Sequence, residues 1–269
     1  MSKTVGDYVI TRKLGSGSFA SVFKAHHTRY PDKVVAIKSI SASKLNKKLQ
    51  ENLTTEIGIL RKIAHVNVVR LYGIQKSDRH IYLLMEYCDG GDLHRFIKKS
   101  PSGKLSIETS RHFMRQLGVG MKYLWSKSLI HRDLKPQNLL LSSDGAGGTG
   151  QWQLKIADFG FARHLAVAAM AETLCGSPLY MAPEILKFHK YDAKADLWSA
   201  GTILFEMLTG RPPFHGANPQ ELLRNIEKTE LLFPQGISIN TDCRDLIQQL
   251  LRKDPIERVS FEEFFRSKF

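Results

Sequence analysis

The string His131-Arg132-Asp133-Leu134-Lys135-Pro136-Gln137-Asn138 is the most informative stretch of this chain of 269 residues. It brings imidazole, guanidinium, carboxylate, ammonium and amide side chains together within eight residues, and the apolar segment 139–141 follows directly. Further along the chain come Asp158-Phe159-Gly160 and then Ala182-Pro183-Glu184. Three polar motifs in this order indicate a dedicated chemical site.

The three motifs resemble those of the eukaryotic protein kinases, in which the first is the catalytic loop. The resemblance extends over residues 8–269. It implies an α+β, two-lobed protein kinase fold, with a small antiparallel sheet lobe that carries one main helix and a larger helical lobe. We expect residues 1–89 to form the small ATP-binding lobe and hinge, and residues 90–269 to form the large substrate-binding and catalytic lobe.

Hydrophobic periodicity gives an independent expectation for the secondary structure. Short β-branched or alternating segments predict strands at 8–14, 21–25, 34–40, 68–74 and 81–85. Apolar residues spaced by three or four predict a helix within 45–64 and another at 110–125. The segment 197–208 is apolar nearly all round and is followed by Gly210, which predicts a helix that is buried in a core and ends there.

The segment Gly15-Ser16-Gly17-Ser18-Phe19-Ala20 is a glycine-rich loop between two predicted strands. A Rossmann loop would lead into a helix, and a Walker loop would carry a GK[ST] sequence, so we expect a hairpin whose amides cover phosphates. A plain hairpin turn remains the alternative. Lys38 ends the strand that follows, and Glu56 lies on the apolar stripe of the next helix, where a carboxylate needs a partner such as Lys38.

The resemblance also implies roles for the individual site residues. Asp133 would accept the proton of the substrate hydroxyl, Lys135 would support the γ-phosphate, and Asn138 and Asp158 would bind Mg²⁺. Lys38 would hold the α- and β-phosphates of ATP while Glu56 orients it. The expected ATP-binding residues are Leu14, Gly15, Ser16, Gly17, Val22, Ala36, Lys38, Met85, Glu86, Cys88, Asp92, Leu140 and Asp158. Leu60, Leu71, His131 and Phe159 would stack into the internal spine of the family, held by Asp196, and Glu184 would pair with Arg258.

A regulatory switch is expected between Asp158 and Glu184. By family position, a phosphate on Thr173 would meet Arg132 and Arg163 in charge-assisted hydrogen bonds and order the segment. The alternative is that Thr173 is an ordinary loop hydroxyl.

Other features indicate the type of kinase. Lys135 in the catalytic loop and Ser177-Pro178 resemble the serine/threonine kinases, and Gln137, Leu179 and Phe161 suggest a serine preference with apolar flanking residues. The strings AETLCGSPLYMAPEIL and KYDAKADLWSAGTILFEMLTGRPPF resemble the autophagy-initiating serine/threonine kinases. The resemblance implies protein substrates, and autophagy-initiation partners that bind a C-terminal region absent here. The alternatives are a pseudokinase-like binding scaffold and a serine/threonine kinase of another signalling pathway.

Composition limits the remaining classes. The sequence opens without an apolar leader and its three cysteines are far apart, so we expect a cytoplasmic protein. The resemblance to the autophagy-initiating kinases implies recruitment, at most peripheral, to membranes of forming autophagosomes. The formal charge is +13, and residues 1–63 hold twelve Lys or Arg against four Asp or Glu. Without a recognised nucleic-acid module, this basic region is interpreted as a solvated face and no nucleic-acid partner is expected. Lys44, Lys47 and Lys48 are an alternative docking site for a phosphorylated segment or an anionic membrane.

Overall fold

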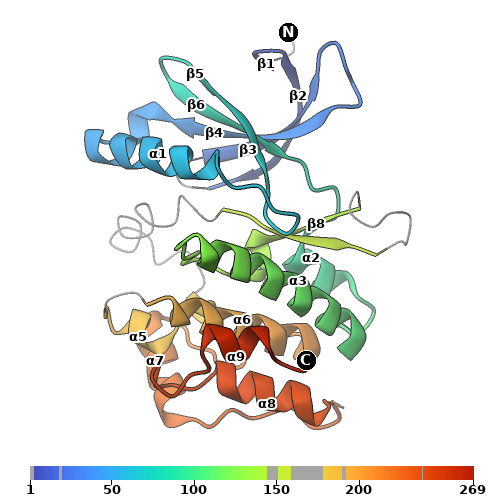
Figure 1. Cartoon of the computed structure of the whole chain (residues 1–269), viewed down its shortest axis with the longest axis vertical. Coiled ribbons are helices and arrows are strands. Elements are labelled where there is room, and N and C mark those ends of the chain that lie inside the picture. The colour runs from blue at the N-terminus through green and yellow to red at the C-terminus, as the bar shows by residue number, and fades with distance from the viewer. Residues whose placement is uncertain (1–2, 18–19, 144–150, 159–177, 190–191, 238) are drawn as a thin grey trace. The chain divides into compact units, whose positions relative to one another are not determined.

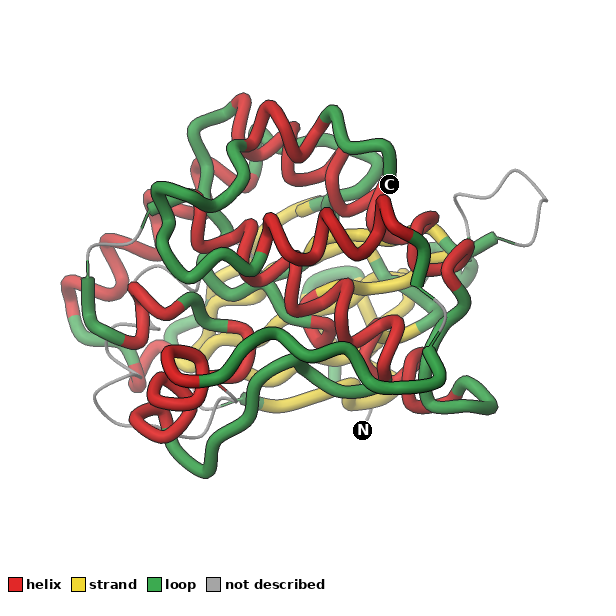
Figure 2. Tube along the Cα trace, turned by 90° about the horizontal axis from the view of Figure 1, so that it is seen from below, coloured by secondary structure: helices red, strands yellow, loops and turns green. Residues whose placement is uncertain are grey.

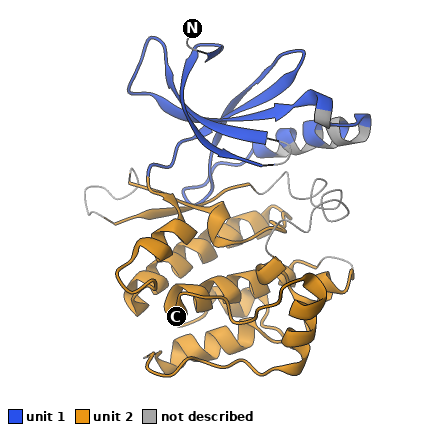
Figure 3. Ribbon diagram, turned by 180° about the vertical axis from the view of Figure 1, so that it is seen from behind, with its two compact units in different colours: residues 1–89 blue, residues 90–269 orange. Residues whose placement is uncertain are grey.

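The computed structural model describes residues 3–17, 20–143, 151–158, 178–189, 192–237 and 239–269. The described chain divides into two compact units, Met1–Asp89 and Gly90–Phe269, which Figure 3 colours separately. Figure 1 labels the helices and strands, and Figure 2 colours the helices red and the strands yellow.

The first unit is built on an antiparallel sheet with the strand order β1-β2-β3-β4-β6-β5. Its strands are β1 (Thr4–Val5), β2 (Tyr8–Ser16), β3 (Ala20–His27), β4 (Val34–Ser41), β5 (Leu71–Lys76) and β6 (His80–Glu86). A short 3-10 turn, η1 (Ala42–Lys44), precedes helix α1 (Lys47–Leu60), which lies beside the sheet in Figure 1. The strands expected at 8–14, 21–25, 34–40 and 81–85 are confirmed, each with slightly wider bounds.

Two predicted boundaries in this unit were wrong. The strand expected at 68–74 begins only at Leu71, and Val68 and Val69 are buried outside the sheet. The helical stripe of 45–64 belongs to a helix over only 47–60, because Leu45 is buried at the end of the preceding 3-10 turn. In both places an apolar side chain is buried by a loop, which periodicity does not distinguish from the adjoining element.

The second unit is mainly helical. In its helix α6 (Lys194–Thr209) every residue from 195 to 208 is buried. The other helices are α2 (Leu93–Lys99), α3 (Ile107–Ser126), α5 (Pro183–Leu186), α7 (Pro219–Lys228), α8 (Thr241–Leu250) and α9 (Phe261–Phe265), with 3-10 turns η2 (Pro136–Asn138) and η3 (Pro178–Tyr180). The helices expected at 110–125 and 197–208 are thereby confirmed. Gly210 caps α6 with a φ of 78°, and a Cβ there would lie 2.6 Å from the Gly103 carbonyl oxygen.

The second unit also contains a three-stranded sheet that the sequence pattern did not predict. Its strands are β7 (Gly91–Asp92), β8 (Leu139–Ser142) and β9 (Gln153–Ile156), in the order β7-β8-β9. Leu139, Leu141, Leu154 and Ile156 are fully buried, so this sheet is fixed to the helical core. It matters for function because it follows the string 131–138 directly and ends two residues before Asp158.

Candidate active site

In the first unit, strand register brings most of the expected nucleotide-binding residues onto one face of the sheet. Val22 pairs with Lys38 across β3 and β4, and Ala36 pairs with Met85 across β4 and β6. Directly opposed residues of antiparallel strands point to the same face, and positions two apart on a strand share that face. Val22, Ala36, Lys38 and Met85 therefore form one surface, at whose edge Glu86 accepts a hydrogen bond from the Arg70 amide at 3.1 Å.

The glycine-rich loop is a hairpin between β2 and β3, as its position between two predicted strands indicated. Gly15 pairs with Val22 and Ser16 with Ser21, and the Gly17 amide donates to the Ala20 carbonyl at 2.8 Å. Leu14 falls at an irregularity in the pairing between Lys13 and Gly15. The tip residues Ser18 and Phe19 lie outside the described residues.

Lys38 does not end its strand as expected, because β4 continues to Ser41; the residue is almost completely buried, with 9% of its surface exposed. A lysine there has lost most of its hydration, which favours a role for its charge over a solvated position. Glu56 belongs to α1, but its side chain is outside the described part of the chain. Their pairing remains a prediction.

One buried carboxylate accepts hydrogen bonds from the main chain of the segment 131–138. Asp196, near the start of α6 and 5% exposed, accepts hydrogen bonds from the main-chain amides of His131 at 2.7 Å and Arg132 at 3.0 Å. The backbone of Arg132 has a φ of 71°, in the left-handed region that residues other than glycine rarely adopt. The carboxylate thus stabilises a strained turn just before Asp133 and holds His131 as expected, whereas the stacking of His131 with Leu60, Leu71 and Phe159 remains a prediction.

The side chain of His131 joins the loop to the strand β9. Its Nε2 is 2.8 Å from the Ala157 carbonyl oxygen, and the Asp133 amide donates to its Nδ1 at 3.2 Å. Because a carbonyl accepts and an amide donates, His131 is the neutral tautomer with the proton on Nε2. The imidazole is therefore a structural link between the catalytic loop and the segment that leads to Asp158.

The carboxylate of Asp133 is the centre of a polar cluster. Lys135 Nζ lies 2.9 Å from Oδ1 and 2.7 Å from Oδ2, and Asn138 Nδ2 donates to Oδ2 at 2.9 Å and to the Asp133 carbonyl at 2.8 Å. The Asp133 side chain is 35% exposed and that of Lys135 28%, so both are open to a substrate. A carboxylate held in place and accessible is suited to accept a proton from a hydroxyl.

Strand pairing also brings the two expected metal ligands to the same end of the β8–β9 hairpin. Asn138 precedes β8, the Ala157 amide donates to its carbonyl at 2.8 Å, and Asp158 follows at once with a φ of 58°. Because Asn138 uses its Nδ2 on Asp133, its amide oxygen is the atom suited to a metal, and Asp158 adds an exposed carboxylate. Two such oxygens are the hard ligands that Mg²⁺ prefers, so the residues present fit this ion.

The remaining expected nucleotide residues of this unit lie close by. Asp92 on β7 is directly opposite Leu140 on β8, so both side chains lie on one face. Asp92 also caps α2, since its Oδ1 accepts from the Arg95 amide at 2.9 Å and its Oδ2 lies 3.3 Å from Arg95 Nε. A ribose hydroxyl would have to share this carboxylate with the helix cap.

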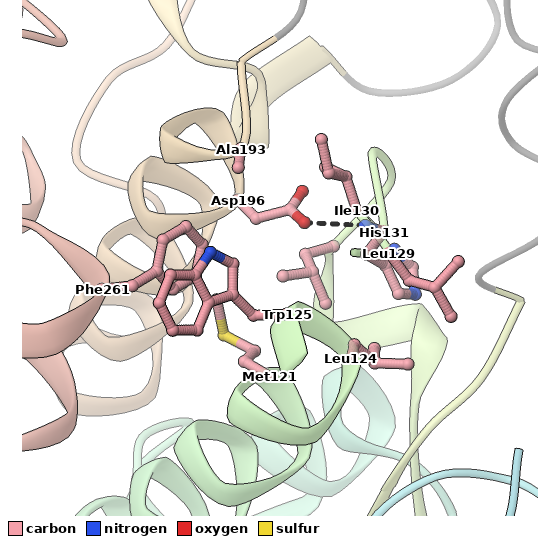
Figure 4. A pocket seen from close by; sticks show the side chains of 10 residues that line it. Met121, Leu124, Trp125, Leu129, Ile130, His131, Ala193, Asp196 and Phe261 are labelled. Atoms are coloured by element: carbon pink, nitrogen blue, oxygen red, sulfur yellow. Dashed lines mark hydrogen bonds between the residues drawn. The ribbon is translucent and has the colours of Figure 1, made fainter. Parts of the chain in front are cut away.

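Beneath the loop is a cavity of about 10 Å³, shown in Figure 4. Its walls are apolar side chains from α3, the catalytic loop and α9, including Met121, Trp125 and Phe261, with the Asp196 carboxylate at one side. A space of this size holds at most one water molecule. It is therefore packing beneath the loop and not a ligand site.

The structure also contains a buried carboxylate that was not expected from the sequence. Glu206 on α6 is 1% exposed, Tyr180 donates to its Oε2 at 2.6 Å, and His94 Nδ1 lies 3.5 Å from its Oε1. Burial, followed by the charge of Glu206, raises the pKa of Tyr180 far above its ordinary range, so the phenol stays protonated and donating. The signal was present, because Glu206 is a carboxylate within a segment that is otherwise apolar all round.

The expected ion pair of Glu184 and Arg258 is confirmed and is fully buried. Arg258 NH1 and NH2 lie 2.7 Å and 2.9 Å from the two carboxylate oxygens of Glu184, with side-chain exposures of 0% and 8%. Such a bidentate ion pair joins helix α5, which contains Glu184, to the segment between α8 and α9, which contains Arg258. The switch residues Thr173 and Arg163 lie outside the described residues, as do Phe159 and Phe161.

The family of the chain follows from comparison of the whole sequence. A model of the protein kinase domain matches residues 8–269. The chain belongs to the protein kinase family. As a kinase domain it is 53% identical over 269 residues to serine/threonine-protein kinase ATG1b of Arabidopsis thaliana, covering 99% of this chain and 37% of that protein.

Two further relatives are also similar over nearly the whole of this chain but are much longer than it. Serine/threonine-protein kinase ATG1a of Arabidopsis thaliana is 51% identical over 271 residues, which cover all of this chain and 42% of that protein. Serine/threonine-protein kinase atg1 of Schizosaccharomyces pombe is 46% identical over 298 residues, covering 99% and 36%. This kinase chain thus spans well under half the length of these relatives. Among its described helices none has the length and apolar character needed to cross a membrane.

Proposed function

We propose that this chain is an ATP-dependent protein-serine/threonine kinase, which transfers the γ-phosphate of ATP to a protein hydroxyl. The observation that supports this best is the Asp133 carboxylate, accessible yet held within 3 Å of Lys135 Nζ and Asn138 Nδ2. Relatives named serine/threonine-protein kinase, about half identical in sequence, support the same activity.

The residues of the catalytic loop have separate tasks in this proposal. Asp133 would orient the attacking hydroxyl and accept its proton as that oxygen bonds to the γ-phosphorus, while the bond from the γ-phosphorus to the bridging oxygen breaks and ADP leaves. Lys135, an ammonium beside that carboxylate, places positive charge where the transferred group becomes more negative. Asp196 keeps both in position through the main-chain amides of His131 and Arg132.

The residues expected to bind the nucleotide and its metal follow from the family resemblance. Bound ATP supplies the phosphoryl group, and Mg²⁺ neutralises its oxygens. Lys38, oriented by Glu56, would bind the α- and β-phosphates beneath the hairpin of Gly15, Ser16 and Gly17, and Asn138 and Asp158 would hold the metal. The adenine would lie against the apolar residues Leu14, Val22, Ala36, Met85 and Leu140. The main chain from Glu86 to Cys88 would bind the adenine edge, and Asp92 would lie near the ribose.

Regulation and cellular role are proposed on narrower grounds. A phosphate on Thr173, paired with Arg132 and Arg163, would order the switch segment. The likeness to proteins named ATG1 supports a role in autophagy initiation, with protein substrates modified mainly on serine, cytoplasmic location and recruitment to forming autophagosomes. Partners would bind the regions that the longer relatives have in addition.

The decisive experiment is phosphate transfer from ATP to a serine peptide in the presence of Mg²⁺, with Asp133→Asn compared with the wild type. We expect kcat to fall by about 100-fold or more while ATP still binds, because the amide accepts no proton. Asp32→Asn, an exposed aspartate of the first unit, is the matched control and should keep full activity. Equal rates for wild type and Asp133→Asn would refute the mechanism.

Two further arms separate the alternatives. If the wild type bound ATP without transferring phosphate, the chain would be a binding scaffold. A Thr173→Ala variant with full specific activity would disprove the switch, and a peptide array dominated by arginine-directed sequences would disprove the apolar serine preference.

A further inference from the structure

The first unit has a polar cavity on the face of its sheet opposite Lys38. Ser21 pairs with Ser39 across β3 and β4, and Ser41 pairs with His80 across β4 and β6. These positions alternate with Val22 and Lys38 along their strands, so their side chains point to the other face. The cavity is therefore separated from the nucleotide-binding surface of this unit by the sheet itself.

The cavity measures about 230 Å³, and five of its eight lining residues carry side-chain hydrogen-bonding groups. Ser21, Ser39 and Ser41 contribute three hydroxyls, and Lys3 and His80 contribute an ammonium and an imidazole. Within the described part of the chain the hydroxyls of Ser21 and Ser39 make no hydrogen bond, although Ser39 is only 8% exposed. Hydroxyls that no described protein group occupies are available to donate hydrogen bonds to a bound group.

The charged side chains at the cavity are all basic among the described residues. None of the described residues that line it is acidic, and Lys13, which pairs with Phe23, adds a second ammonium on the same face. Lys3 is held near this site because its carbonyl accepts from the Ile10 amide at 2.9 Å, and its Nζ lies 6.0 Å from the centre of the Phe23 ring. The His80 ring stacks on Tyr82 at 5.7 Å, which fixes its orientation.

We propose that this cavity binds a phosphate monoester group. Three hydroxyl donors with one or two ammonium groups match the several acceptor oxygens and the double negative charge of such a group. The volume is below the 300 to 1,000 Å³ that is usual for drug-sized ligands, and it suits a phosphate with its first carbons better than a whole nucleotide. The carrier is either a small phosphorylated molecule or a phosphorylated side chain of a protein.

Occupation of this cavity would act on the glycine-rich hairpin. Gly17 and Ala20 also line it, so a bound phosphate would restrain the hairpin from the side away from Lys38. If the proposed kinase function holds, a restrained hairpin would change the affinity for ATP, and ATP would change phosphate binding by the same factor. This second effect rests on the proposed function, whereas binding to the cavity does not.

The test is an NMR titration of the ¹⁵N-labelled chain with a short phosphoserine peptide, the same peptide with serine, and inorganic phosphate, all at constant ionic strength. Lys38→Met is used as well as wild type, so that phosphate does not report on the nucleotide site. We expect saturable shifts at the amides of Ser21, Ser39 and His80 with the phosphopeptide, a dissociation constant of about 1 mM or tighter, and none with the serine peptide. Stronger binding of the phosphopeptide or of inorganic phosphate identifies the carrier.

The variant Lys3→Gln with Ser39→Ala should weaken this binding by about tenfold or more, a change of about 1.4 kcal/mol. Lys33→Gln removes another exposed lysine that lies 4.7 Å from a tyrosine ring, and it should bind as the wild type does. The proposal is overturned by absence of saturable binding, by equal binding in the double variant, or by loss of all binding in Lys38→Met. An ATP analogue titrated separately tests the nucleotide site, so failure there leaves the cavity result intact.

Discussion

The catalytic loop of the second unit and the glycine-rich hairpin of the first unit are held in opposite ways. In the loop, Asp196, the Ala157 carbonyl, Lys135 and Asn138 together satisfy the polar groups around His131 and Asp133. In the hairpin, one hydrogen bond from Gly17 to Ala20 spans the described turn residues. A Cβ built at Gly15 or Gly17 would meet no described atom within 4 Å.

This difference follows from what each region has to do. A group that accepts a proton must be within hydrogen-bond reach of its target, and buried acceptors fix it there before a substrate binds. A loop that covers a ligand has to admit it, and glycines without contacts allow the backbone to approach closely. The contrast predicts that substitutions under the loop change stability and rate together, whereas those in the hairpin change nucleotide affinity alone.

Asp196→Ala should have the largest effect. It removes both acceptors of the buried amides of His131 and Arg132 and releases a residue with a φ of 71°. Hydrogen bonds to a charged acceptor contribute about 1.5 to 3 kcal/mol each, so we expect the free energy of unfolding to fall by about 3 to 6 kcal/mol. Urea denaturation measures this, and phosphate transfer should fall with it.

Asp196→Asn keeps the shape and one oxygen acceptor, but its Nδ2 would face the other main-chain amide, so it should lose at least half as much stability as Asp196→Ala. If Asp196→Ala had wild-type stability, the loop would not depend on the buried carboxylate and the contrast would fail.

Tyr180→Phe should have an intermediate effect of about 2 kcal/mol, because it deletes the hydroxyl that donates to the buried Glu206 carboxylate. The pH dependence gives a second readout. Burial raises the pKa of Tyr180, so the folded chain keeps this proton while the unfolded chain loses it above about pH 10. Wild-type stability should therefore decline as the pH rises above 10, and Tyr180→Phe should decline less steeply. Parallel curves would contradict this assignment.

Gly17→Ala should have the smallest effect on stability, within about 0.5 kcal/mol, because its φ is not left-handed and the space around it is open. If the hairpin covers phosphates, the KM for ATP should nevertheless rise about threefold, a change of under 1 kcal/mol in binding. Thermal unfolding and initial rates measure the two quantities. A destabilised variant with unchanged KM would reverse the proposed difference between the hairpin and the loop.

Local patterning predicted the central strands and helices but not all their limits. The apolar run before Leu71 and the leucine at position 45 fit the periodicity of their neighbours, yet loops bury them. The β8 and β9 strands have only four residues each, too few for a pattern to show. Their pairing, with Leu139 opposite Ile156, comes from contacts between distant segments.

The candidate site also contains some features that the sequence predicted and others that it did not. The residue types at Asp133, Lys135, Asn138 and Asp158 could be assigned from motifs, since the chemistry requires those side chains. The Tyr180–Glu206 contact joins segments 26 residues apart in sequence, and the serine-lined cavity depends on which positions face away from Lys38. Neither has a motif, because each depends on register or on packing.

The sequence by itself determined the kinase family, the catalytic loop, the buried character of α6 and the hairpin form of the glycine-rich loop. These features follow from residue types and spacings within short segments, where the chemistry or the backbone allows few alternatives. The tertiary structure alone decided that Asp196 supports the strained turn at Arg132, that Ala157 fixes the tautomer of His131, and that Asn138 lies beside the carboxylate of Asp133. Hydrogen bonds of this kind depend on distances of a few ångströms between distant segments, and only the packed chain fixes those distances.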